Sequence, residues 1–234
     1  MFVTLLYHII HNAVRDKIAI PQGAFEAQLC YLRENGYTVL SLSEAIAIVN
    51  HQQSAPPHAV LLTFDDGYAD NLTIALPLLQ RYGMVATVFV ISAYVGHNNR
   101  WNPKACYDVN HMTWDELHLW QQAGCTIGGH THTHQCMTRL SITELYNEVV
   151  RNKCLLEAQL QIPIRAFSYP YGAYNPMAQQ TVSIHYEVAF AVDNGDGASP
   201  LHRHTLHRLT VSPKWDMTAF AHHLERAFAT FSVE

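Results

Sequence analysis

The sequence predicts an α/β protein built as a (β/α) barrel of about seven to eight strands. Short apolar segments of strand length alternate with longer segments that carry helical periodicity and helix caps. This alternation runs the length of the chain without internal repeats or a linker, so we expect one domain over residues 1–234. With 49% hydrophobic residues, the chain is short for this architecture but long enough to bury a large core.

Apolar runs that end at a turn residue or a polar pair predict the strands. In chain order they lie at 2–7, 37–40, 59–62, 85–91, 125–128, 165–169, 187–192 and 206–211. The run at 59–62 contains no polar residue, which indicates a buried strand.

Capping signals predict the helices between these strands. Three capping boxes, each a Ser or Thr followed three residues later by Glu, begin helices at Ser41, Thr113 and Ser141. Gly83 is a typical C-terminal stop. The predicted helices cover 25–34, 41–49, 72–82 (despite Pro77), 113–124, 141–160, 177–184 and 216–231. Residues 94–112 form a long loop that we expect to lie over a site.

Charge and composition limit the kinds of binding partner that the protein is expected to have and the cellular compartment in which it is expected to work. The net charge of -5 and the absence of a basic run argue against nucleic acid or an anionic membrane as a partner and favour a neutral substrate. The N-terminal segment lacks the features of a signal peptide, and no apolar run is long enough to span a bilayer, so we expect a cytoplasmic protein. Five irregularly spaced cysteines without a CxxC motif fit free thiols in a reducing compartment.

Two adjacent carboxylates, Asp65 and Asp66, follow the buried strand at 59–62 and precede Gly67. Side chains alternate along a strand, so these neighbours are expected to point in different directions and to serve different roles, such as a metal ligand and a base. Two like charges this close are costly without a nearby cation. The same residues also suit an ordinary turn with a helix N-cap, and this stretch alone leaves that alternative open.

A histidine-rich stretch at 128–134 follows another predicted strand. His130 and His134 are four residues apart, which on a helical turn places both imidazoles on one face and suits a tetrahedral metal. His132 between them is expected to point away. The alternative is a polar loop with capping threonines. With one aspartate, the two histidines would give the three protein ligands typical of a catalytic zinc site.

A third feature is the turn around Tyr171. Pro170 and Gly172 flank it after a predicted strand, and such a tight turn leaves a backbone N–H available for a developing oxyanion.

Taken together, these motifs resemble those of the polysaccharide deacetylase (NodB-homology) family of carbohydrate esterases, over nearly the whole chain. They are Thr63-Phe64-Asp65-Asp66-Gly67, Gly129-His130-Thr131-His132-Thr133-His134 and Tyr169-Pro170-Tyr171-Gly172. The resemblance implies a distorted (β/α) barrel and a metal-dependent enzyme that removes acetyl groups from N-acetylated sugars. It also implies a divalent metal, most often zinc, with cobalt or nickel as other possibilities.

Carried over residue by residue, the resemblance implies that Asp65 is the catalytic base. It implies that Asp66, His130 and His134 hold the metal. The backbone N–H of Tyr171 would then help to form the oxyanion hole.

The sequence departs from the family pattern in its third motif. The arginine that usually stands two residues before the motif's proline and orients the base is Ser168 here. Arg208 or Arg165 is expected to take its place, although no motif places either.

A second departure concerns the general acid. The Leu-x-His motif usual near the C-terminus has no convincing copy, but Leu6-Tyr7-His8 ends the first strand. Closure of a barrel brings the first and last strands together, so His8 is our candidate for the acid, with His204 and His207 as alternatives. The start of the chain resembles the branch of the family that contains poly-N-acetylglucosamine deacetylases.

The predicted function is hydrolysis of the N-acetyl amide of an amino sugar, in an oligo- or polysaccharide or a lipid-linked sugar. Tyr68, Pro170 and Trp101 are expected to contact this substrate. Two alternatives stay open at this point: hydrolysis of another carbon–nitrogen bond, such as a cyclic ureide, at the same metal site, and a catalytically dead carbohydrate-binding module.

Overall fold

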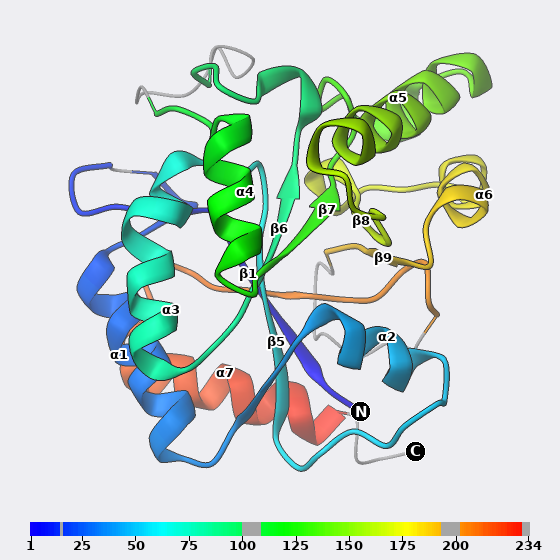
Figure 1. The fold of residues 1–234 in the computed structure, drawn as a ribbon. Coiled ribbons are helices and arrows are strands. Elements are labelled where there is room, and N and C mark those ends of the chain that lie inside the picture. Colours follow the sequence, from blue (N-terminus) through cyan, green and yellow to red (C-terminus); the bar gives the residue numbers. More distant parts are fainter. Residues whose placement is uncertain (15, 100–108, 193–201, 231–234) are drawn as a thin grey trace.

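A curled sheet of parallel strands forms the centre of the molecule (Figure 1). The computed structural model describes residues 1–14, 16–99, 109–192 and 202–230, and within these ranges the sheet has eight strands. Seven follow one another in the order β10–β1–β5–β6–β7–β8–β9, and β4 pairs with β5 beside them. Their bounds are β1 (Val3–Tyr7), β4 (Thr38–Leu40), β5 (Ala59–Phe64), β6 (Thr87–Val90), β7 (Thr126–Gly129), β8 (Ala166–Ser168), β9 (Val188–Phe190) and β10 (Leu209–Thr210).

The first and last strands of the sheet lie side by side, as expected for a barrel. Strand β1 pairs with β10 through Leu5 and Leu209, and on its other side with β5 over its whole length. Near the far edge a bridge joins Phe190 to Leu206, so the segment that leads into β10 runs from β9 back toward β1. The predicted distorted (β/α) barrel is confirmed.

Helices wrap the outside of this sheet (Figure 1). They are α1 (Gln22–Glu34), α2 (Leu42–Val49), α3 (Leu76–Tyr82), α4 (Trp114–Gln122), α5 (Ile142–Leu160), α6 (Pro176–His185) and α7 (Met217–Thr230). Helices α7, α1 and α3 pack in that order, as do α4, α5 and α6. The three predicted capping boxes are formed by Ser41, Thr113 and Ser141, and Gly83 ends α3 in the left-handed conformation. None of the helices in the described ranges combines the length and apolar character needed to cross a bilayer.

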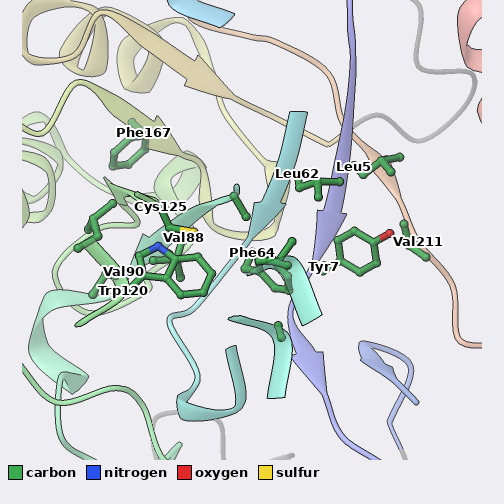
Figure 2. Packing of buried hydrophobic residues seen from close by; sticks show 14 of the residues in the cluster. Leu5, Tyr7, Leu62, Phe64, Val88, Val90, Trp120, Cys125, Phe167 and Val211 are labelled. Atoms are coloured by element: carbon green, nitrogen blue, oxygen red, sulfur yellow. The ribbon is translucent and has the colours of Figure 1, made fainter. Parts of the chain in front are cut away.

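The period of two along the strands of the main sheet divides the residues that pack on it into two clusters. One set of residues packs outward against the helices, among them Leu5, Tyr7, Leu62, Phe64 and Val211 (Figure 2). The alternate set packs with α2 in a smaller cluster that includes Phe2, Leu61, Phe89 and Phe190. Because the strands are parallel, their carboxyl ends lie at the same end of the half-barrel. Residues there that continue the alternate set face its interior.

Two local features differ from the prediction. A small sheet of β2 (Ile9–Ile10) and β3 (Ala19–Ile20) was not predicted, because two-residue strands leave no periodic signal. The helix expected from residue 72 begins instead with a π turn, Asn71–Ala75, in which the Leu76 N–H donates to the Asn71 carbonyl. This wider turn comes directly before α3, whose first turn contains Pro77.

A buried carboxyl group, Asp70, ties the small sheet to this π turn. Its Oδ1 accepts hydrogen bonds from the Ile10 N–H (3.2 Å) and the Asn71 amide (2.9 Å). Among the described residues no cationic side chain forms an ion pair with it, and burial raises the pKa of Asp70 to about 7. The ionised form is therefore disfavoured in the native state.

Replacing Asp70 by Asn should stabilise the protein at alkaline pH. The native-state pKa lies above the usual 3.8, so the native state loses stability as the pH rises through about 7, whereas a neutral amide avoids this loss. We expect Asp70→Asn to raise the Tm at pH 8, by roughly 2–4 °C for each kcal/mol gained, with the gain shrinking toward pH 4. Thermal unfolding at pH 4, 6 and 8 measures this. The exposed control Asp115→Asn should show no such gain, and a gain for Asp70→Asn that is the same at all three pH values would contradict the explanation.

Candidate active site

A cleft of about 570 Å³ opens at the carboxyl ends of the parallel strands. His8 follows β1, Asp65 follows β5 and His130 follows β7, and all three line the cleft. His8 and Asp65 continue the alternate positions of Phe2 and Leu61, which pack in the smaller cluster. A Cβ on Gly128, two residues before His130, would meet Phe89 of the same cluster, so these three residues face inward. Asp66, His134 and Tyr171 line the same cleft.

Asp65 is held by a bidentate ion pair with Arg208. The two guanidinium nitrogens Nη1 and Nη2 lie 2.7 Å from Oδ1 and Oδ2 of the carboxylate, and Arg208 is only 2% exposed. The Ser168 hydroxyl donates to Asp65 Oδ2 (3.1 Å) and accepts from Arg208 (2.8 Å). Burial raises the pKa of Asp65, but Arg208 and His130 outweigh this effect and hold the pKa below its usual value. The carboxylate is therefore ionised and fixed in orientation.

The structure thus separates the two arginine candidates. Arg208 enters the site from the segment before β10 and reaches Ser168, the position at which the family pattern has arginine. Arg165 lies at the surface, where its guanidinium pairs with Glu187 at 2.6 and 2.9 Å. The structure does not bring Arg165 to the cleft.

Asp66, His130 and His134 converge on one point. Asp66 Oδ1 lies 3.4 Å from Nε2 of each histidine, and the three atoms are buried. His130 donates from Nδ1 to the Ser168 carbonyl (2.7 Å), which fixes the ring so that its Nε2 faces Asp66. Asp66 has a left-handed backbone (φ 73°), which turns its side chain away from the direction taken by Asp65.

This trio fits a divalent cation. Asp66 Oδ1 is buried and has no hydrogen-bond partner among the described residues, and the ligand atoms of the trio lie within 4.8 Å of one another. Burial lowers the pKa of His134 to about 3, which keeps its imidazole neutral. Burial raises the pKa of Asp66, but the neighbouring His130 more than offsets this and holds the pKa below its usual value, so the carboxylate is ionised. A carboxylate and two imidazoles beside an open cleft are the donors of a catalytic metal site.

The helical turn predicted for His130 and His134 is wrong. The residues after β7 form an irregular loop in which Thr131 and His134 have left-handed φ values of 62° and 61°. His132 is turned away, as expected, and its Nδ1 shares a hydrogen bond with the Ser92 hydroxyl (2.9 Å). The two candidate ligands are brought together by this loop and not by helical periodicity.

Two polar residues on α5 hold the loop, and the sequence analysis missed both. The Asn152 amide donates to the carbonyls of Thr131 (2.6 Å) and Val90 (3.0 Å). The Glu148 carboxylate accepts from the Thr133 N–H (2.7 Å) and hydroxyl (2.6 Å). Their signal in the sequence is a polar pair spaced i, i+4 on the same helix face as buried Leu145 and Val149.

Glycine is required where the loop leaves β7. A Cβ atom on Gly129 would lie 2.3 Å from Asn152 Oδ1 and 2.5 Å from the Tyr186 hydroxyl. The strand and α5 therefore approach closely enough for Asn152 to reach the loop.

The segment at 109–112 packs against the aspartate turn. The N–H groups of Ala69 and Met112 donate to the carbonyls of Asn110 (2.8 Å) and Gly67 (2.9 Å). His111 donates from Nδ1 to the Asp66 carbonyl at 2.9 Å. Part of the loop predicted over the site thus supports it, while residues 100–108, with Trp101, lie outside the described residues.

Tyr171 forms part of the wall of the cleft. It is 65% exposed, has a left-handed φ of 62°, and its ring lies 4.8 Å from that of His134. Pro170 is buried within the turn that presents it. Tyr68 lines the cleft but is fully buried and stacks on His111 at 4.9 Å.

His8 is the one of the three general-acid candidates that the structure places in the cleft. It is half-buried, and burial lowers the pKa of His8 below its usual value by more than the nearby Asp66 and Asp65 raise it. His204 donates from Nε2 to the Tyr186 carbonyl (3.0 Å). Among the described residues that line the cleft, neither His204 nor His207 is present.

Comparisons with known proteins agree with this geometry. The family model described as polysaccharide deacetylase matches residues 52–189. YxkH of Bacillus subtilis (strain 168) is 30% identical over 222 residues, which cover 94% of this chain and 75% of that protein. The poly-beta-1,6-N-acetyl-D-glucosamine N-deacetylase of Escherichia coli (strain K12) is 30% identical over 96 residues, covering 40% of this chain and 14% of that protein.

Solved structures share the fold at lower identity. The Streptococcus pyogenes deacetylase PplD, in complex with acetate, superimposes with a TM-score of 0.82 at 23% identity and covers 95% of this chain and 97% of its own. IcaB from Ammonifex degensii gives a TM-score of 0.81 at 22% identity over 96% of this chain and 97% of its own.

Loss of Arg208 should destabilise the protein far more than loss of Arg165. Arg208→Ala leaves the buried Asp65 charge without its partner, which we expect to cost about 3–5 kcal/mol in the free energy of unfolding. The surface pair of Arg165 with Glu187 predicts a cost of about 0–1 kcal/mol for Arg165→Ala. Urea unfolding of the two variants measures both values. If both variants lost less than about 1 kcal/mol in the free energy of unfolding, the buried pair would contribute no more to stability than the surface pair does.

The trio should bind one divalent cation per chain. Calorimetric titration of chelator-treated protein with zinc should give a stoichiometry near one, and Asp66→Ala or His130→Ala should weaken binding by more than about 100-fold. His132→Ala is the matched control from the same loop and should bind as the wild type does. Wild-type affinity in Asp66→Ala would exclude the trio as the site.

Proposed function

The chain belongs to the polysaccharide deacetylase family, and we propose that it hydrolyses the N-acetyl amide of an N-acetylated amino sugar and releases acetate. The sugar would be part of an oligo- or polysaccharide or a lipid-linked intermediate, and residues 1–234 would form one catalytic domain. The observation that carries the proposal is the ionised Asp65, fixed by Arg208, beside the trio of Asp66, His130 and His134. The substrate assignment draws support from the relative in Escherichia coli, whose name states this activity.

Asp66, His130 and His134 would hold the divalent metal, for which zinc suits a carboxylate and two imidazoles, with cobalt and nickel as alternatives. When bound, this ion would supply polarisation of the amide carbonyl and of the attacking water. His130 is oriented for this role by its hydrogen bond to the Ser168 carbonyl.

Asp65 would act as the general base. Its carboxylate faces the cleft and would accept a proton from the water that attacks the amide carbon. Arg208 and the Ser168 hydroxyl occupy both carboxylate oxygens, which fixes their direction and keeps the group ionised. Arg208 would thus be the base-orienting residue.

Tyr171 and His8 would act on the oxygen and the nitrogen of the scissile amide. The backbone N–H of Tyr171, in its left-handed turn, would donate to the developing oxyanion. His8, in its protonated form, would give a proton to the leaving amine, which is a poor leaving group without one. The exposed ring of Tyr171 would contact the sugar, with Pro170 fixing the turn below. Tyr68, which is buried against His111, would support the wall of the cleft instead of touching the sugar.

Amine release from N-acetylglucosamine oligomers tests the proposal. Zinc-loaded wild type should release free amine, and Asp65→Asn should lower kcat by about 10²–10⁴-fold, the usual contribution of a general base. Zinc titration of Asp65→Asn shows whether it still loads, and the exposed Asp115→Asn is the activity control. Absence of amine release by the loaded wild type would contradict the substrate class, and wild-type turnover by Asp65→Asn would contradict the base.

A further inference from the structure

A buried pair of side chains, Asp70 and Asn71, holds the main chain directly after the His8 side chain, at the His8 carbonyl and the Ile10 N–H. The Asn71 amide donates to the His8 carbonyl at 2.7 Å and to Asp70 Oδ1 at 2.9 Å. Asp70 Oδ1 also accepts from the Ile10 N–H at 3.2 Å. Asn71 is 0% exposed and Asp70 is 7% exposed.

The main chain needs such support at this point because the sheet ends there. Strand β1 ends at Tyr7, whose carbonyl accepts from the Asp65 N–H at 3.0 Å. Beyond it, the chain leaves β5 and pairs in the separate β2–β3 sheet. The His8 peptide thus lies between two sheets, and the Asn71 side chain bonds to it there.

The π turn places this support next to the aspartates. Asp65, Asp66, Asp70 and Asn71 belong to one short segment, in which the Asn71 N–H donates to the Tyr68 carbonyl at 3.0 Å. The π turn begins at Asn71, and such turns often occur at functional sites. The turn that supports the backbone of the candidate acid therefore follows the aspartates of the cleft within a few residues of the same chain segment.

We propose that Asn71 is a positioning residue that acts through His8, and that Asp70 holds the Asn71 amide in place. The inference rests on the proposed function, because it requires His8 to protonate the leaving amine. Without the Asn71 amide, the His8 imidazole would no longer be fixed over the scissile bond, and a displacement of this kind can cost about 10²-fold in rate.

A double-mutant cycle on amide hydrolysis tests the coupling. Asn71→Ala should lower kcat for N-acetylglucosamine oligomers by about 10–100-fold with little change in KM. The double variant His8→Ala with Asn71→Ala should be no slower than His8→Ala alone, because the second change acts through a side chain already removed. Thr73→Ala, at an exposed position of the same π turn, is the matched control and should keep wild-type activity.

A second substrate distinguishes the contribution of the general acid to the rate from that of the rest of the site. 4-Nitrophenyl acetate releases a phenolate that needs no proton from the enzyme, so Asn71→Ala should keep nearly wild-type turnover on this ester while losing amide hydrolysis. Asp70→Asn retains an acceptor for both hydrogen bonds and should keep amide activity, whereas Asp70→Ala should lose it. Asn71→Leu, which keeps the side-chain volume, repeats the measurement if Asn71→Ala does not fold.

Additive losses in the double variant, or equal losses on amide and ester, would overturn the positioning role. The proposed function would then still stand, because the wild type and Asp65→Asn report on it separately. Full amide activity in His8→Ala would remove the acid assignment and this inference together.

Discussion

The buried ion pair between Asp65 and Arg208 is the interaction on which the site depends. Two charges in the interior are costly unless each is satisfied, and here both carboxylate oxygens meet the guanidinium while Ser168 and the Ala191 carbonyl take further bonds. The pair joins the end of β5 to the segment before β10, with β1 between these strands in the sheet. The same contact therefore balances charge, orients the carboxylate and fastens the last strand to the barrel.

Much of the fold and part of the site could be predicted because their signals are local. Capping boxes at Ser41, Thr113 and Ser141 place helix starts within a few residues, and apolar runs of only four to seven residues have the length of strands. Asp65 and His130 were identifiable because each directly follows a strand, and parallel strands deliver their carboxyl ends to one edge.

The rest depends on contacts between residues far apart in the sequence. Arg208 lies 143 residues from Asp65 in the sequence. The sequence could therefore offer both Arg208 and Arg165 as candidates, but it could not decide between them. The spacing of His130 and His134 suggested a helix because periodicity carries no information on positive φ values, which α5 imposes through Asn152. The π turn at Asn71 likewise follows from packing against β2, which is too short to leave a pattern.

The pairing of β1 with β10 also constrains the order in which the protein can become complete. Strand β1 leaves the ribosome well before β10 and Arg208, which come much later in the chain. Until they emerge, β1 has an open edge and Asp65 lacks its counter-charge, so a nascent chain can form the β5–β9 side of the sheet but not a finished cleft. Maturation of the site is thereby a late event in folding.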